Sequence, residues 1–355
     1  MPLLAVQVED LRCIRHADLQ LDPKFTLITG PNAAGKTSLL EAMFFLGRGC
    51  SFRTRRVEKL IRTGADGLTL IGHLASDVRP ILLGIRARRD ATEARIGGRP
   101  AASLADLATA FPVQVIDPNL HKLIEEGPSG RRRAMDWGVF HVEPQFVRDW
   151  QRYQRVLKQR NAALRMQLPA EATRAWDKEL VIAGTSLSLA RQRYLRQLQP
   201  IAEKTGRSLT HLDLDIALAQ GWSSDQTLGE ALVASWPRDS KFRATTVGPH
   251  RADMEIRVNG FPARDRVSRG QQKLVAASLI LAQLELLQRS SARVGTLLLD
   301  DPAAELDAGH LQALMAHVAG LGPQLVVTAT ASSVEALQEP GARFHVEQGV
   351  VTRML

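Results

Sequence analysis

The spacing of hydrophobic and polar residues changes from one part of the chain to another. Short β-rich runs, such as LLAVQVEDL at 3–11 and FTLIT at 25–29, predict strands in the first third. Helical spacing follows, with long runs at 150–167 and 185–204. Apolar strand-like runs return near the end, as at 296–299. The order of elements is therefore an α/β beginning, a helical middle and an α/β end.

The domain organisation follows from this order. Neither end of the chain carries a complete α/β sheet by itself, so the two ends are expected to build one domain together. We predict that residues 1–120 and 239–355 form this domain and that residues 121–238 form a mainly helical insertion. No heptad repeat is sustained, which indicates a compact insertion rather than a long coiled coil.

Composition restricts the class of protein. With 45% hydrophobic and 23% charged residues in 355 positions, the chain is typical of a globular protein. No apolar stretch approaches the roughly 18 residues of a membrane helix, and the N-terminus lacks a secretory signal, so we expect no membrane span and a cytoplasmic location. Two cysteines, Cys13 and Cys50, are too few for a disulfide framework and are expected to be free thiols.

A phosphate-binding motif lies between a predicted strand and a predicted helix. Residues 30–37 read GPNAAGKT and match G-x-x-x-x-G-K-[ST], in which glycines let successive backbone N–H groups face one centre. The helix adds the positive end of its dipole, Lys36 is expected to contact the β- and γ-phosphates, and Thr37 is expected to bind Mg²⁺. The candidate nucleotide ligands are Gly30, Pro31, Asn32, Ala33, Ala34, Gly35, Lys36 and Thr37. The motif predicts binding of ATP or GTP.

Two adjacent carboxylates end an apolar run near the C-terminus. Asp300 and Asp301 follow TLLL, and two such charges at the end of a buried strand are costly without a cation. In a protein with a phosphate-binding loop, Asp300 is expected to hold Mg²⁺. Asp301 is then placed to orient or deprotonate the attacking water. The pair predicts nucleotide hydrolysis.

The chain is basic, with 46 Lys and Arg against 37 Asp and Glu and a net charge of +9, which favours a nucleic-acid partner. Basic residues gather in three clusters: Arg53, Arg55, Arg56, Lys59 and Arg62; Arg131, Arg132 and Arg133; and Arg152, Arg155, Lys158, Arg160 and Arg165. Residues 152, 155 and 158 share one helix face, which suits contact with a phosphate backbone. With only 5% aromatic residues, duplex contact is favoured over base stacking. A solvated or ion-paired face remains the alternative for each cluster.

Several motifs together resemble a known family. GPNAAGKT, SRGQQ at 268–272, LLLDD at 297–301 and AELD at 304–307 are similar to the nucleotide-binding heads of the ABC superfamily. Within it, GPSGRRRAMDWGVFH at 127–141 and VGPHRAD at 247–253 resemble the RecF family of bacterial replication and recombination-repair proteins. The resemblance spans the whole chain. It implies an α/β fold, an ABC-type ATPase head with mixed β-sheets in two lobes, interrupted by the helical insertion.

The resemblance also implies roles for individual residues. It makes ATP the nucleotide and Asp301 the catalytic base, and it makes Gln114 a sensor of Mg²⁺ and water and Arg15 a nucleotide contact. A signature segment that contacts ATP held by a second molecule contains Ser268, Gly270 and Gln271. Asp307 is the aspartate that faces the partner subunit.

The function implied is an ATP-dependent DNA-binding protein of recombinational repair and replication restart in the response to DNA damage. An ATP-induced homodimer binds gapped or junction DNA and, with RecO and RecR, promotes RecA loading, and slow DNA-stimulated hydrolysis releases it. DNA contact is expected at Arg53, Arg55, Arg56, Arg152, Arg155 and Lys158. Alternatives are a structural SMC-like chromosome-organising head with little hydrolysis, a transporter ATPase and a small-molecule kinase.

Two departures from transporter ATPases bear on turnover. Asp301 stands where they have glutamate, so the shorter side chain predicts slow hydrolysis. Thr330 stands where they have a histidine that contacts the γ-phosphate. For His250 and Arg251, a nucleotide contact, a DNA contact and a structural turn all stay open.

Overall fold

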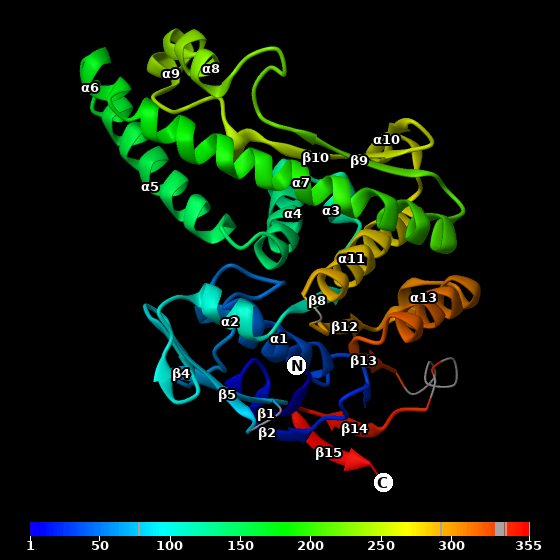
Figure 1. Cartoon of the computed structure of the whole chain (residues 1–355). Coiled ribbons are helices and arrows are strands. Elements are labelled where there is room, and N and C mark those ends of the chain that lie inside the picture. The colour runs from blue at the N-terminus through cyan, green and yellow to red at the C-terminus, as the bar shows by residue number, and fades with distance from the viewer. Residues whose placement is uncertain (77–78, 292, 331–336, 338, 355) are drawn as a thin grey trace. The chain divides into compact units, whose positions relative to one another are not determined.

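The computed structural model describes residues 1–76, 79–291, 293–330, 337 and 339–354, and the chain divides into two compact units (Figure 1). Unit 1 comprises Met1–Leu120 and Leu287–Leu355, and unit 2 comprises His121–Leu286. The insertion predicted for 121–238 falls inside unit 2, which continues to Leu286 because strands and helices after residue 238 pack against its helices.

Unit 1 contains two sheets (Figure 1). The antiparallel one runs in the order β2 (Ile14–Gln20), β1 (Leu3–Leu11), β4 (Gly67–Leu74), β5 (Ile81–Arg88), β6 (Thr92–Ile96) and β7 (Arg99–Pro100). The mostly parallel one runs in the order β15 (Val350–Met354), β14 (Ala342–Glu347), β3 (Phe25–Thr29), β13 (Gln324–Ala329), β12 (Thr296–Asp300) and β8 (Val113–Ile116). Because the central strands are parallel and buried, they read as continuous apolar runs.

Helix α1 (Lys36–Arg48) packs against strands of both sheets. Its buried side chains, including Leu39, Met43 and Phe45, join one core cluster with residues of β1 and β13. The helix predicted after the phosphate-binding motif is therefore confirmed. Unit 1 also contains η1 (Val57–Lys59), α2 (Leu104–Ala110), α12 (Pro302–Glu305) and α13 (Ala308–Leu321). The parallel strands and α1 therefore bring the phosphate-binding turn to the same sheet edge as Asp300.

Unit 2 is mainly helical around an antiparallel sheet in the order β11 (Phe261–Pro262), β10 (Asp253–Val258) and β9 (Leu214–Ala219). Its helices are α3 (Lys122–Glu125), α4 (Pro128–Val142), α5 (Phe146–Arg165), α6 (Ala170–Arg174), α7 (Asp177–Thr210), α8 (Leu228–Ala234), α9 (Trp236–Phe242), η2 (Pro249–Arg251), α10 (Ala263–Arg266) and the start of α11 (Arg269–Ser291). Helix α7 extends the predicted run at 185–204 in both directions, since its apolar face packs on α5 and β9. A Cβ at Gly184 would lie 2.6 Å from Leu228, which shows how closely α7 and α8 approach.

Candidate functional site

The phosphate-binding turn joins β3 to α1. Gly30 and Gly35 have φ values of 150° and 120°, which side chains rarely adopt. A Cβ on Gly30 would lie 2.2 Å from the Val346 carbonyl oxygen, so no larger residue fits there. The Ala34 carbonyl accepts a hydrogen bond from the Gly349 N–H at 2.9 Å. The hairpin formed by β14 and β15 therefore holds the turn in shape.

Lys36 lies at the first position of α1, and its ammonium is directed into the turn. Its Nζ donates to the carbonyl oxygens of Gly30 at 2.8 Å and Pro31 at 2.9 Å. Burial lowers the pKa of Lys36, and the nearby carboxylates of Asp301 and Asp300 oppose that shift. A phosphate group would offer this ammonium a charged acceptor in place of neutral carbonyls, which makes a stronger hydrogen bond.

Thr37 and Asp300 meet, although they are far apart in the sequence. The Thr37 hydroxyl lies 2.9 Å from Oδ1 and 3.0 Å from Oδ2 of Asp300. Asp300 ends β12 and is only 7% exposed. It also accepts a hydrogen bond from the buried Thr328 hydroxyl of β13 at 2.8 Å. Thr328 was not predicted as a site residue, because its only signal in the sequence is a hydroxyl in the apolar run LVVTA.

Asp301 turns away from the strand into the left-handed region, with φ 47° and ψ 54°. Its backbone N–H donates to the Thr328 hydroxyl at 2.9 Å. Among the described residues its Oδ1 is buried without a hydrogen-bond partner. Burial raises the pKa of Asp301, while the charge of Lys36 opposes the shift and Asp300 adds to it. Two neighbouring carboxylates, one of them unsatisfied, indicate a place for a cation.

These residues fit a Mg²⁺–nucleotide complex. Mg²⁺ prefers a few carboxylate or hydroxyl oxygens together with phosphate oxygens. Thr37 and Asp300 would hold the ion, and Lys36 and the N–H groups of the turn would hold the phosphates. Within the described parts of the chain, no group of three or more His, Cys, Asp or Glu side chains could hold a metal without such a ligand.

The structure does not bring Gln114 to this group. It is buried in β8 and pairs with Leu297 of β12. Asp300 lies three residues further along β12. Three residues of strand span about 10 Å, so Gln114 lies well back from the carboxyl edge of the sheet. Arg15 is exposed at the start of β2. Its neighbours lie at the turn, since a Cβ on Gly35 would lie 3.0 Å from Cys13 Sγ.

The predicted signature segment caps helix α11 in unit 2. The Gln271 N–H donates to Ser268 Oγ at 3.3 Å, and the Ser268 N–H donates to Gln271 Oε1 at 3.0 Å, which is a capping box. Ser268, Gly270 and Gln271 are exposed. A Cβ on Gly270 would have no atom of the described residues within 4 Å. Packing among those residues therefore gives no reason for a glycine in this helical turn.

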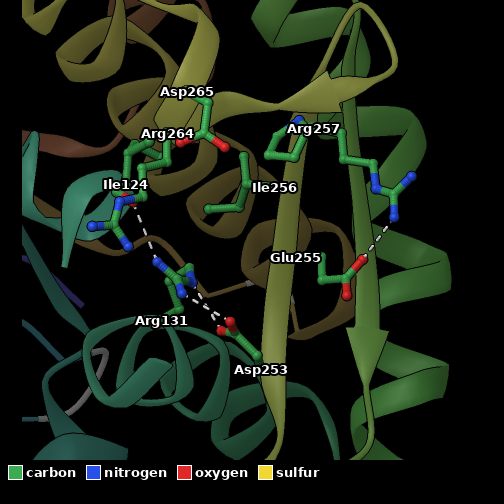
Figure 2. A pocket seen from close by; sticks show the side chains of 9 residues that line it. Ile124, Arg131, Asp253, Glu255, Ile256, Arg257, Arg264 and Asp265 are labelled. Atoms are coloured by element: carbon green, nitrogen blue, oxygen red, sulfur yellow. Dashed lines mark hydrogen bonds and ion pairs between the residues drawn. The ribbon is translucent and has the colours of Figure 1, made fainter. Parts of the chain in front are cut away.

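A pocket of about 270 Å³ lies among the elements that lead to this segment (Figure 2). Arg131 of α4 donates to both Asp253 carboxylate oxygens at 2.8 Å and to the Glu126 carbonyl at 2.6 Å, so it ties β10 to the end of α3. Arg269, the residue after Ser268, lies 3.4 Å from Glu125 of the same α3. These ion pairs hold the start of α11 to α3 and, through Arg131, to β10.

Asp307 caps helix α13 in unit 1. Its Oδ1 accepts the His310 N–H at 3.0 Å, and its Oδ2 lies 2.5 Å from His310 Nδ1. The hydrogen bond from the His310 N–H is the main cause that lowers the pKa of Asp307. The side chain is 68% exposed, so the capping carboxylate remains accessible to another molecule.

The predicted cluster at 53–62 is mostly exposed. Arg55, Arg56 and Lys59 are exposed, and Arg53 is exposed at 3.9 Å from the buried Glu41. Arg62 differs, since it is half-buried and pairs with Asp10 at 2.7 Å. In the cluster at 131–133, Arg132 donates to the Ala252 carbonyl, and Arg133 is exposed.

The third predicted cluster, at 152–165 on α5, has both exposed and buried members. Arg155 and Lys158 are exposed, and Arg152 is exposed but pairs with Glu179 of α7. Arg160 is fully buried, so its predicted place on a basic surface is wrong. Its guanidinium binds Asp177 and the buried Asp239, each at 2.7 Å, and Thr245 at 2.9 Å. The other four members of the cluster, including Arg165, are exposed, and the predicted face of Arg152, Arg155 and Lys158 is unaffected.

His250 joins α5 to the loop before β10. Its Nε2 donates to the Thr245 carbonyl at 2.9 Å, so its Nδ1 accepts the Tyr153 hydroxyl at 2.7 Å. Burial lowers the pKa of His250 to about 4, so the ring is neutral. Arg251 is exposed. Of the roles left open for His250, these contacts support the structural turn.

Among the residues that the structure describes, none of the helices combines the length and the apolar character of a membrane span.

Comparisons with known proteins agree on one relationship. The RecF/RecN/SMC N-terminal domain family matches residues 2–352. The DNA replication and repair protein RecF of Thioalkalivibrio sulfidiphilus is 40% identical over 99% of each chain. The protein of that name from Shewanella sp. (strain MR-7) is 39% identical, again over 99% of each chain. A solved structure of the recombination mediator protein RecF with ATP in the RecFOR pathway has a TM-score of 0.91 and 25% identity, covering 100% of this chain and 98% of that one.

Proposed function

The chain belongs to the RecF family of DNA replication and repair proteins, and on that basis we propose that it is an ATP-gated, DNA-binding ATPase. One observation carries the proposal: the phosphate-binding turn, Thr37 with Asp300, and the unsatisfied Asp301 lie together at one sheet edge. A relative solved with ATP has the same fold, which supports ATP as the nucleotide.

The residues at this edge of the sheet have different roles in hydrolysis. Lys36 and the N–H groups of the turn would orient the phosphates, and Thr37 and Asp300 would hold Mg²⁺, which when bound would neutralise phosphate charge. Asp301 takes a proton from the attacking water.

Turnover is expected to be slow. Asp301 is one methylene shorter than the glutamate of transporter ATPases, which places its carboxylate on the order of 1 Å further from the water. Its left-handed backbone is one that aspartate adopts more readily than glutamate. A rate well below roughly 10 s⁻¹ suits a protein that uses ATP to time its release from DNA.

Dimerisation on ATP completes the site. The exposed Ser268, Gly270 and Gln271 begin α11, where free N–H groups and the helix dipole favour an anion. In the proposed dimer this cap contacts the γ-phosphate held by Lys36 of the second molecule. The capping box would open to offer its donors, and Asp307 would face the second molecule.

DNA would be held by its phosphate backbone, through Arg53, Arg55 and Arg56 of unit 1 and the exposed face of α5 in unit 2. These exposed guanidinium and ammonium groups suit phosphate and carry no base readout. The RecFOR pathway named for the solved relative supports RecO and RecR as mediators. We propose RecA loading on gapped DNA as the outcome. We place this activity in the cytoplasm.

Sedimentation with and without Mg²⁺–ATP, followed by hydrolysis assays with and without gapped duplex DNA, tests the proposal. We expect an ATP-dependent dimer and slow hydrolysis that DNA stimulates, both lost in Lys36→Ala. A dimer without hydrolysis would instead support a structural chromosome-organising head. Hydrolysis indifferent to DNA would contradict the proposed function.

A further inference from the structure

Thr328 lies in β13 directly opposite Asp300 of β12 in the parallel register. It is fully buried between apolar residues of its strand. Valine would have the same shape at this position without the cost of burying a hydroxyl. The two shortest hydrogen bonds of the Thr328 hydroxyl both join it to the acidic pair. The site described above therefore includes a polar contact for which the phosphate-binding motif and the acidic strand end gave no role.

The two bonds use the hydroxyl in opposite senses. Its single proton goes to Asp300 Oδ1 at 2.8 Å, since the Leu299 carbonyl is at 3.5 Å. Its lone pair accepts the Asp301 N–H at 2.9 Å. That N–H is the first one beyond β12, so a side chain takes the place of the next bond of the sheet.

The consequences differ for the two carboxylates. Donation to Oδ1 fixes the rotation of the Asp300 carboxylate next to Thr37 Oγ1, which lies 2.9 Å from that same oxygen. Acceptance from the Asp301 N–H holds the backbone at the φ of 47° that carries the Asp301 side chain away from the strand. A β-branched threonine has few χ1 rotamers available in a strand, so its hydroxyl position is well defined.

We propose that Thr328 is the positioning residue that sets Asp300 toward Mg²⁺ and Asp301 toward the attacking water. It acts through these two carboxylates and touches neither the nucleotide nor the reacting atoms. The inference rests on the proposed ATPase function of the same site.

The test compares Thr328→Val, which keeps the shape and removes the hydroxyl, with Thr328→Ser, which keeps the hydroxyl. We expect the Mg²⁺ concentration for half-maximal ATP-dependent dimerisation to rise about 10- to 100-fold in Thr328→Val, the usual effect of losing a partner of a metal ligand. We expect kcat to fall by a similar factor while KM for ATP in excess Mg²⁺ stays within about threefold. Thr328→Ser should restore both.

Thr26→Val is the matched control. Thr26 is fully buried in β3, and its hydroxyl accepts the Asp22 N–H at 2.9 Å, away from the carboxylates. Its loss should affect stability but leave the Mg²⁺ dependence unchanged. If Thr328→Val does not fold, Thr328→Ala and Thr328→Ser differ by the hydroxyl alone and provide the same comparison.

Two results would overturn the inference: a Mg²⁺ dependence of Thr328→Val equal to that of the unsubstituted chain, or a Thr328→Ser variant as impaired as Thr328→Val. Binding of a fluorescent ATP analogue in EDTA should be equal in all variants and shows that the phosphate-binding turn is intact. An unsubstituted chain that neither dimerises with ATP nor hydrolyses it would refute the proposed function itself, so the two failures are distinguishable.

Discussion

Gly270→Ala is expected to change folding and dimerisation in opposite directions. Gly270 lies in the first turn of α11, is exposed, and leaves open space where a Cβ would be. Within one molecule, an alanine methyl group therefore contacts none of the residues that the structure describes and only restricts the unfolded chain. In the proposed dimer, the added methyl group would stand between the helix backbone and the γ-phosphate of the second molecule.

The two effects can be estimated separately. Glycine in a helix costs about 0.5–1 kcal/mol relative to alanine, so the free energy of unfolding should rise by that amount. Forcing a methyl group into a close contact costs about 1–3 kcal/mol. A symmetric dimer contains the contact twice, so the dimer should weaken by about 2 kcal/mol or more, which is roughly 30-fold in its dissociation constant.

Urea unfolding without nucleotide measures the first effect, and sedimentation velocity with Mg²⁺–ATP measures the second. Gly320→Ala is the control, because Gly320 is also helical, exposed and surrounded by open space, but lies in α13. It should gain stability without affecting the dimer. A Gly270→Ala chain that dimerises as tightly as the unsubstituted one would refute the close approach at this position.

Further predictions address hydrolysis, pH and DNA. Asp301→Asn keeps a side chain suited to the left-handed backbone, so we expect ATP-dependent dimers with hydrolysis reduced about 100-fold or more in a phosphate-release assay; unchanged turnover would exclude Asp301 as the base. Burial lowers the pKa of His250 to about 4, from the roughly 6.5 of a histidine in the unfolded chain. The neutral ring therefore stabilises the fold fully above pH 6.5, and this contribution to the free energy of unfolding is lost as the pH falls toward 4. In urea unfolding, the free energy of unfolding should fall by on the order of 2 kcal/mol between pH 7 and pH 5. The fall should be smaller in His250→Gln, and an equal fall in the variant would contradict this. Arg155→Ala with Lys158→Ala should reduce the slope of log affinity against log salt for duplex DNA by about 2, whereas an unchanged slope would remove both from the interface. Arg160→Ala should instead destabilise the chain by about 3–5 kcal/mol in urea unfolding, because it leaves buried carboxylates unpaired; a loss below about 1 kcal/mol would contradict that role.

The sequence predicts those parts of the site whose conformation is determined by residues close by in the chain. Glycine at 30 and 35 is required by the turn itself, and the apolar run before Asp300 indicates a buried strand with its charge at the end. Both features follow from neighbouring residues, so the juxtaposition of Thr37 with Asp300 could be expected from the motif alone. The α/β class could likewise be expected from the order of strand-like and helical runs, whereas the mixed sheets were implied by the family resemblance.

What the sequence could not predict depends on distant partners. Arg160 shares the buried face of α5 with Tyr153 and Leu157, but its charge favours a surface position, and only the fold brings Asp239 to it. Gln114 stands at a plausible place in the chain, but the register of β8 on β12 sets it back from the site. Thr328 is a single hydroxyl among apolar residues, and its role requires knowing which strand pairs with β12.

The central claim is that each ATP is shared between two molecules, and a mixing experiment tests it directly. Lys36→Ala should lose the phosphate contact, and Ser268→Arg should block the cap, so neither variant alone should form an ATP-dependent dimer in sedimentation velocity. When the two are mixed with Mg²⁺–ATP, one intact site remains, made from Lys36 of one chain and Ser268 of the other. We predict that a dimer, weaker than that of the unsubstituted chain, reappears with measurable hydrolysis. A mixture that stays monomeric, or a Ser268→Arg chain that dimerises alone, would contradict the account.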